Sequence, residues 1–595
     1  MRWPTLALTG IRPFVAARVS TAAVSWRLAW WQATRAGVAL GGRGFRSALG
    51  PAEGLAMRQY VWLARSRPIR LLLLAWAVSY AGDMAAFTVA SVYLYGAGGA
   101  GYVGLLWLEY ALFAVFLVPL IGSWADRVPR ERLLTATHIP RALLLGAAGA
   151  AMSGRGQAML VAVLVALDGG LCSVFRPVQA ALLPWLARTP DELTSANTAA
   201  SVMQAAAVLG GPAIAAGLLS AGTPRSAMFA TCGIVAAAAV LLAGVRPLAA
   251  PVPAQEAKIF KQLRLDMAAG FTACIRQRGA LALVVPAAVQ TFARGVLSVL
   301  TVVIALDLFG LGPAGVGLLG AALGAGGILG TPLAVVLVRG KRVARCFCAG
   351  VAGWGVPMIL LAFTHAPYWA YLLFGAVGVA NLIDDVAVYS ALQRVIPPRL
   401  MGRALGARRA VLLLTAGLGS AVTPLLIHAF GARATLAGVG LLLIATAAGF
   451  LPSLKAIDSR LSAPGPQVAL LRQVSFLGPL PFATVEHLAS VLRSAAYEPG
   501  DVIIREGDPG ECFYLIAAGR ARASKDGRHL SEMGAADSFG EIALLRSIPR
   551  TATVTAISRL QAWVLDREEF LAAVTGSPES ADSADAVVSA RLGVG

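Results

Sequence analysis

The chain has 595 residues, of which 57% are hydrophobic and only 13% are charged. In soluble domains about a quarter of the residues are charged. This chain has too few charged residues for a water-facing surface over most of its length, so a wholly soluble protein is excluded. The formal net charge of +20 would suit a nucleic-acid partner, but Arg and Lys gather in short loops between apolar runs, as on the cytoplasmic face of a membrane.

Residues 1–69 form a basic N-terminal extension that has Glu53 as its one acidic residue and interleaves Trp26, Trp30 and Trp31 with arginines. This pattern suits an amphipathic helix on an anionic membrane surface. A disordered basic leader, or a protein that starts at Met57, remains an open alternative.

Apolar segments of about 20 residues then follow one another, which is the length that a helix needs to cross a bilayer. We expect a six-helix lobe at 70–246, a central cytoplasmic loop at 247–279 and a second six-helix lobe at 280–454. The twelve expected helices are 70–95, 101–124, 133–153, 158–184, 197–221, 226–246, 280–308, 314–338, 344–363, 368–394, 404–429 and 433–452.

A weak internal repeat relates the two lobes. At a constant offset of 213 residues, Gly82 aligns with Gly295, and the four residues VGLL from Val103 recur from Val316. The same offset pairs Pro119 with Pro332 and Pro184 with Pro397. An offset that holds over several helices predicts two homologous halves.

The loop GSWADRVPRERL contains Gly122, Asp126, Arg127 and Arg130 in the spacing G-x-x-x-D-R-x-x-R. It resembles the gating loop between the second and third helices of the major facilitator superfamily, whose members are built from parallel repeats. The resemblance implies a twelve-helix fold in which Asp126 docks at the positive N-terminal end of the eleventh helix. A plain basic loop is the alternative.

Two further stretches, RPVQAALLPWL from Arg176 and ALQRVIPPRLMGRALG from Ala391, resemble facilitators that export drugs and siderophores. Gly210, Gly211 and Pro212 are loosely similar to the antiporter signature of the fifth helix. Ala215 stands where that signature has glycine, so the resemblance supports export only weakly.

Ionisable residues in the middle of a bilayer cost at least about 2.5–3.5 kcal/mol each, so each one needs a reason. We expect Asp83 and Arg294 to face each other near a substrate site, as a pair or a proton-sensitive switch. An interhelical contact that only holds the bundle together is the alternative for any one residue. The candidates for transport or proton coupling are Asp83, Glu109, Asp168, Arg294, Asp384 and Asp385.

The stretch FGEIALLRSIPRTATV, from Phe539 to Val554, has exposed backbone N–H groups, a carboxylate and a guanidinium within a few residues. Such groups bind a ribose hydroxyl and a phosphate. The stretch resembles the phosphate-binding cassette of cyclic nucleotide-binding domains, which implies a jelly-roll-like β-roll with flanking helices at 470–575. A β-roll that has lost its ligand is the alternative.

The resemblance implies that Glu541 binds the ribose 2′-hydroxyl, that Arg550 binds the cyclic phosphate, and that Gly540, Ile542 and Ala543 lend backbone N–H groups. Thr551 could bind a guanine amino group, so cAMP and cGMP both stay open as the ligand. A semi-rigid linker at 455–469 precedes the domain, and a disordered Ser/Ala/Asp-rich tail is expected at 576–595.

These expectations together describe a mainly α-helical, multi-pass protein of the cell membrane with its N-terminus and nucleotide domain in the cytoplasm. The leading functional hypothesis is an ion-coupled exporter of a small solute that cytosolic cAMP or cGMP regulates. A nucleotide-gated channel and a receptor or scaffold without transport are the alternatives. We expect a monomer that is not an enzyme, with no cofactor, no metal and no nucleic-acid partner.

Overall fold

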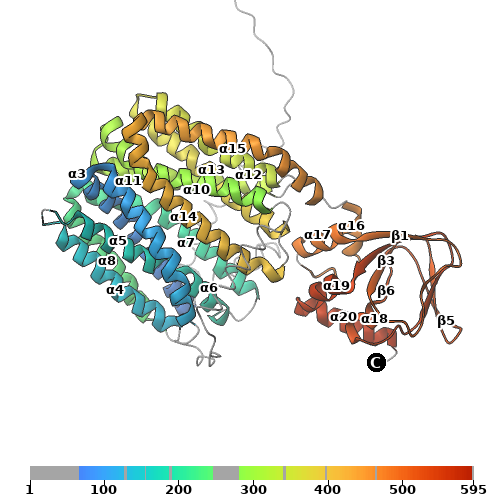
Figure 1. Cartoon of the computed structure of the whole chain (residues 1–595). Helices are drawn as coiled ribbons and strands as arrows, with labels where there is room; N and C mark the ends of the chain where they lie inside the picture. Colours follow the sequence, from blue (N-terminus) through green and yellow to red (C-terminus); the bar gives the residue numbers. More distant parts are fainter. Residues whose placement is uncertain are drawn as a thin grey trace, which may run out of the picture.

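The computed structural model of the chain describes residues 66–125, 130–154, 156–186, 190–245, 280–338, 343–395, 398–461, 465–480 and 482–592. Figure 1 shows a bundle of long helices and, beyond the end of α15, a smaller domain that contains the β-strands. The predictions for residues 1–65 and for the whole of the central loop at 247–279 fall outside the described residues.

Long apolar helices build the N-terminal lobe. The first of them, α3, is two helices joined at Gly98 and Gly99, where the backbone leaves helical geometry and Gly99 takes a φ of 70°. A capping box between Thr223 and Ser226 starts the last helix. The helices are α3 (Arg67–Ala125), α4 (Arg130–Ala151), α5 (Ala158–Cys172), α6 (Phe175–Leu186), α7 (Pro190–Ala221) and α8 (Pro224–Ala243).

The C-terminal lobe repeats this arrangement, with one wide turn of π-helix, η2, at the end of its first helix. Its elements are α10 (Ala280–Val303), η2 (Ile304–Leu308), α11 (Gly312–Val338), α12 (Val343–Phe363), α13 (Pro367–Val395), α14 (Pro398–Phe430) and α15 (Ala432–Leu461).

Ten stretches of the described residues are long and apolar enough to cross a membrane, and one of them covers both helices of α3. The helix that these ten leave out is α4, which has 22 residues and includes Arg132 and Arg141. Arg141 is fully buried within the bundle, so its charge does not face lipid. The twelve-helix architecture expected from the sequence is therefore confirmed.

The two lobes are structural copies of one another. Gly99 and Gly312, which are 213 positions apart, join the first two helices of each lobe with φ values of 70° and 69°. Only glycine adopts this left-handed conformation at low cost. Contacts repeat as well, because α4 packs against α5 and α8 just as α12 packs against α13 and α15.

Glycines also bring the lobes together. Gly104 of α3 lies against the backbone of Ser420 in α14, and its repeat partner Gly317 of α11 lies against the backbone of Pro212 in α7. A Cβ atom at either position would collide with the opposite helix. Both contacts lie in the half of the bundle away from the C-terminal domain, where Tyr95 also donates a hydrogen bond to Asp307.

The C-terminal domain is a roll of two four-stranded antiparallel sheets, ordered β1-β8-β3-β6 and β2-β7-β4-β5. Phe513 and Phe570 stack at 4.7 Å in its core, beside Phe476. Its helices are α16 (Gly465–Leu471), α17 (Phe482–Val491), α18 (Glu541–Arg546), α19 (Arg567–Thr575) and α20 (Pro578–Leu592). Its strands are β1 (Arg493–Tyr497), β2 (Val502–Ile504), β3 (Cys512–Ala518), β4 (Ala521–Lys525), β5 (Arg528–Met533), β6 (Ser538–Phe539), β7 (Thr553–Ala556) and β8 (Leu560–Asp566).

Helix α17 contacts the ends of α13 and α15, so the C-terminal domain lies directly against the second lobe (Figure 1). The end of α15 is hydrogen-bonded to the start of α12. Asp458 accepts hydrogen bonds from the backbone N–H groups of Ala344 and Arg345 at the start of α12, at 2.8 and 3.2 Å. A carboxylate is well placed at the positive end of a helix.

The expectation of a disordered tail at 576–595 is wrong for the described part of that segment. Residues Pro578–Leu592 form helix α20, which buries Ser580, Ala584 and Val588 against the domain. These residues recur every four positions and so share one face of the helix. The Ser/Ala/Asp composition concealed this narrow buried stripe.

Candidate functional site

The loop between β6 and α18 has the backbone geometry of an anion-binding turn. Gly540 precedes α18 with a left-handed φ of 92°, and Ser547 ends the helix with a φ of 52°. A Cβ on Gly540 would meet the Arg550 guanidinium at 2.7 Å. Glycine is therefore required here both for the turn and for the close approach of Arg550.

Arg550 is held from two sides. Its guanidinium donates hydrogen bonds to the carbonyls of Gly540 at 3.0 Å and Cys512 at 2.8 Å, and it lies 6.0 Å from the centre of the Tyr514 ring. The residue is only 6% exposed. Burial lowers the pKa of Arg550 from its usual value. A pre-positioned, poorly hydrated guanidinium is well suited to bind a phosphate.

Glu541 lies beside this arginine and is 1% exposed. Its Oε1 accepts a hydrogen bond from Arg591 of α20 at 2.6 Å, whereas its Oε2 is buried and has no partner. Burial raises the pKa of Glu541, and the positive charge of Arg591 opposes that rise. A buried carboxylate oxygen without a donor fits a ligand hydroxyl group.

The other residues predicted for this site belong to the same turn. Ala543 is buried against Gly510, Ile542 is half-buried between Glu541 and Ala543, and Thr551 follows Arg550 and is also half-buried. The structure thus brings all six predicted residues together. Sequence reasoning missed Arg591, which lies fifty positions away in the segment expected to be disordered.

A second cluster of charged side chains lies inside the N-terminal lobe. Arg141 of α4 donates to Asp168 of α5 at 2.9 Å, to Ser79 at 2.7 Å and to Asp83 of α3. Cys172 also donates to Asp83, and His138 contacts both Ser79 and Arg141. All six of these residues are buried, and the second oxygen of Asp168 has no partner among the described residues.

The expected pairing of Asp83 with Arg294 is wrong in this structure. Asp83 pairs with Arg141, and Arg294 donates instead to Asn381 and lies 3.6 Å from Asp385. Arg294 also lies over the Trp354 ring, 5.6 Å from its centre. Sequence reasoning passed over Arg141 because α4 is the least apolar of the spanning helices.

The remaining acidic candidates differ in their surroundings. Asp384 is buried with an unpartnered Oδ1, whereas the side chain of the adjacent Asp385 is 51% exposed. Successive residues point about 100° apart on a helix, so the two carboxylates take different environments. Glu109 of α3 also has a buried oxygen without a partner.

Only part of the predicted gating loop can be placed. Gly122 belongs to the last turns of α3 and Arg130 is the first residue of α4. Asp126 and Arg127 fall outside the described residues, so the predicted docking of Asp126 on the eleventh helix stays a prediction.

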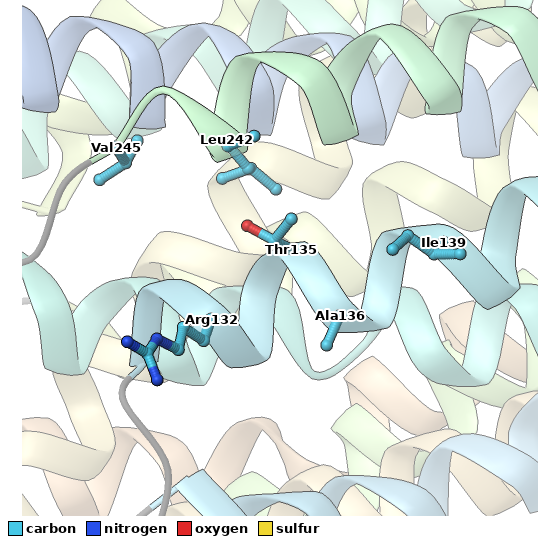
Figure 2. A pocket seen from close by; sticks show the side chains of 7 residues that line it. Arg132, Thr135, Ala136, Ile139, Leu242 and Val245 are labelled. Atoms are coloured by element: carbon cyan, nitrogen blue, oxygen red, sulfur yellow. The ribbon is translucent and has the colours of Figure 1, made fainter.

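A groove of about 320 Å³ lies between α4 and α8, away from all these candidates (Figure 2). None of the predicted site residues lines it. In Figure 2, Arg132 lies at one end of the groove and Ile139 at the other. Its lining residues are Arg132, Thr135, Ala136, Ile139, Leu242, Ala243 and Val245.

A bundle of two repeated six-helix lobes with charged residues inside it is the architecture of a transporter-type membrane protein, and the β-roll is a second folded domain beside it. Comparison with protein families agrees. Residues 71–383 match the Major Facilitator Superfamily, and residues 495–576 match the cyclic nucleotide-binding domain. The chain belongs to the major facilitator superfamily and carries a C-terminal cyclic nucleotide-binding domain; neither is a catalytic family.

Curated relatives match a short part of the chain. A cAMP-dependent protein kinase regulatory subunit of Yarrowia lipolytica is 38% identical over 102 residues, which are 17% of this chain and 27% of that protein. That of Dictyostelium discoideum is 42% identical over 91 residues, 14% and 28% of the two chains. A cGMP-dependent protein kinase of Plasmodium berghei is 39% identical over 90 residues, 15% and 10% of the two chains. The chain therefore spans at most 28% of the length of these three relatives.

Two solved structures also resemble this domain. The regulatory domain of Toxoplasma gondii PKA with cAMP has 26% identity and a TM-score of 0.20, covering 23% of this chain and 55% of that one. The regulatory subunit of a cAMP-independent protein kinase A from Trypanosoma brucei has 26% identity and a TM-score of 0.21, covering 23% and 50%.

Proposed function

We propose that this protein is an ion-coupled exporter of a small solute whose activity is regulated by cytosolic cAMP or cGMP. The observation that carries the proposal is the direct contact of α17 with α13 and α15. A domain of the cyclic nucleotide-binding family therefore touches the moving part of a transporter. The basic loops and the even number of spans support a cytoplasmic C-terminal domain.

In the proposed site, Arg550 binds the cyclic phosphate, together with backbone N–H groups of Gly540, Ile542 and Ala543. The unpartnered Oε2 of Glu541 accepts a hydrogen bond from the ribose 2′-hydroxyl. A bound nucleotide would supply two negatively polarised phosphate oxygens to a guanidinium that now bonds only backbone carbonyls. Thr551 is the proposed contact to the base, and cAMP and cGMP both stay open as the ligand.

The proposed regulation runs through α20 and α17. Arg591 of α20 donates to both Glu541 and the carbonyl of Ser538, so the ligand site and the C-terminal helix share a carboxylate. Ser580 of the same helix bonds the carbonyl of Phe476, in the segment that joins α16 to α17. A ligand that changes the position of α20 would therefore change how α17 meets the second lobe. Such coupling requires the two states of the transporter to contact α17 differently.

The proposed ion-coupling site is the cluster around Arg141. Two carboxylates, Asp83 and Asp168, share one guanidinium, and neither is open to solvent. Burying an uncompensated charge costs free energy, and two carboxylates with one guanidinium leave one negative charge uncompensated. A proton on one of the two carboxylates would bring the net charge of these three groups to zero. Loss of that proton when water enters the bundle would couple proton movement to a conformational change.

Flux measurements on the full chain in proteoliposomes test the proposal. We expect saturable flux that depends on a proton gradient and that changes when cAMP or cGMP is present on the side of the C-terminal domain. Unsaturable current would favour a channel. Nucleotide binding without flux of any solute would favour a receptor or scaffold.

A further inference from the structure

Four arginines form two pairs that are linked through the adjacent residues Arg408 and Arg409 of α14, and one of the pairs joins the two lobes. They are Arg176 of α6, Arg294 of α10, and Arg408 and Arg409 of α14, and we call them the interlobe arginine cluster. Arg176 of the first lobe is close enough to Arg409 and Tyr389 of the second lobe to interact with them electrostatically. Arg408 interacts in the same way with Arg294 and Asp385.

These arginines are only partly neutralised. Among the described residues, Asp384 and Asp385 are the carboxylates that interact with Arg294 and Arg408, and no carboxylate is recorded against Arg176. The four guanidinium groups therefore keep a formal excess of two positive charges over these two carboxylates. The other contacts are to neutral groups. Arg176 donates to the amide oxygen of Gln204, and Arg294 donates to that of Asn381. Neutral partners leave a charge available for a ligand.

The cluster is also accessible. The side chains of Arg294 and Asp385 are 42% and 51% exposed, and Arg176, Arg409 and Tyr389 are exposed as well. The buried Nε atoms of Arg294 and Arg408 have no hydrogen-bond partner. The exposed guanidinium groups carry excess positive charge and bond neutral partners, which points to an anion as the ligand. The exposed Tyr389 ring adds an apolar surface for the body of that anion.

We propose that the solute handled by this transporter is an organic anion, a compound with a carboxylate, sulfonate or phosphate group on an aromatic or apolar body. This inference rests on the proposed transport function and gives the substrate class. The acidic residues alone would favour a cationic compound. Those acids are engaged elsewhere, because Asp83 and Asp168 are enclosed with Arg141.

Two probes with the same aromatic body and opposite charge test this inference. The full chain in nanodiscs is titrated with naphthalene-2-sulfonate and with 2-naphthyltrimethylammonium, and binding is followed by calorimetry and by the thermal unfolding midpoint. We expect the sulfonate to bind and stabilise the protein and the ammonium compound to do neither. Stronger binding of the ammonium compound, or binding of neither, would overturn the inference.

Variants then locate the binding. Arg176→Gln and Arg409→Gln should each weaken sulfonate binding by roughly 10- to 100-fold, the value of a charge-assisted hydrogen bond, and the Lys variants should keep part of it. Arg132→Gln is the matched control, because Arg132 is an exposed arginine in the groove between α4 and α8 (Figure 2). An equal loss in the control would also overturn the inference.

The inference and the proposed function can fail separately. Saturable, nucleotide-dependent flux of the ammonium probe would support the proposed transport function and contradict the organic-anion substrate class. Sulfonate binding without flux would support the anion-binding site and contradict the proposed transport function.

Discussion

In the N-terminal lobe, Arg141 of α4 donates a hydrogen bond to Asp168 of α5. The equivalent positions of the second lobe, 213 residues further on, hold Trp354 of α12 and Asn381 of α13. The second lobe supplies its guanidinium from a different helix, because Arg294 of α10 lies over Trp354 and donates to Asn381. Both lobes thus place an arginine beside the same position of the repeat. Duplication preserved the place of the charge but not the residue that provides it.

The difference lies in what surrounds each arginine. Arg141 is fully buried and bonds two carboxylates, whereas the Arg294 side chain is 42% exposed and bonds an amide. Under our proposals, the first arrangement holds a proton and the second leaves charge available to a solute. The β-roll combines both features, since Glu541 is partly satisfied by Arg591 and partly unpartnered.

Arg141→Ala should have the largest effect. It leaves two buried carboxylates without their cation, which costs about 3–5 kcal/mol of stability when a buried pair is broken. The thermal unfolding midpoint of the purified protein measures the loss. Arg141→Met combined with Asp83→Asn and Asp168→Asn removes all three charges and should recover much of the stability. No difference between Arg141→Ala and Arg294→Ala would contradict the contrast between the lobes.

Arg550→Ala should weaken cAMP or cGMP binding by about 2–4 kcal/mol, because a desolvated phosphate loses its charged partner. Calorimetry on the full chain measures the change. Arg528→Ala, in an exposed strand of the same domain, is the control and should leave the affinity as it is. Unchanged affinity in the Arg550 variant would mean that the turn is a structural relic without its ligand.

Nucleotide affinity should fall by about threefold or more as the pH is lowered through the pKa of Glu541. Burial raises that pKa above the usual value, so Glu541 takes up a proton at a higher pH than an exposed glutamate does. A protonated carboxyl is a poorer acceptor for the ribose hydroxyl. Calorimetry between pH 7.5 and about 5 should show the decline, and Glu541→Gln should abolish this pH dependence while lowering affinity throughout. A pH-independent affinity in the unaltered protein would count against the role of Glu541.

Arg294→Gln should have the smallest effect on stability, less than about 1 kcal/mol, because its half-exposed ion pair with Asp385 is screened by solvent. Thermal unfolding beside Arg141→Ala provides the measurement. A loss as large as that of the buried cluster would mean that Arg294 holds the lobe together and is not available for a ligand.

Much of this molecule could be predicted from its sequence because the signals are local. Spans of about 20 apolar residues, the offset of 213 and the turn from Gly540 to Thr551 each lie within one segment or repeat. Hydrophobic length and backbone geometry determine such features directly. The twelve helices, the β-roll and the grouping of the six residues predicted for the nucleotide site followed from them.

The partners of buried charges could not be predicted in the same way. Arg141 lies 58 positions from Asp83, and Arg591 lies 50 positions from Glu541, so only the folded arrangement of helices brings them together. The repeat does not support the expected pair, since the position equivalent to Asp83 is Val296 and Arg294 lies two residues before it, about 200° of helix rotation away. Each charge has its partner within its own lobe.

The most direct test measures solute flux in proteoliposomes that contain the full chain, with cAMP or cGMP added to the side of the C-terminal domain. We predict saturable flux that changes with nucleotide in the unaltered protein and no longer responds to nucleotide in Arg550→Ala. Flux that is identical with and without either nucleotide, in a protein shown to bind it, would contradict the coupling of the two domains.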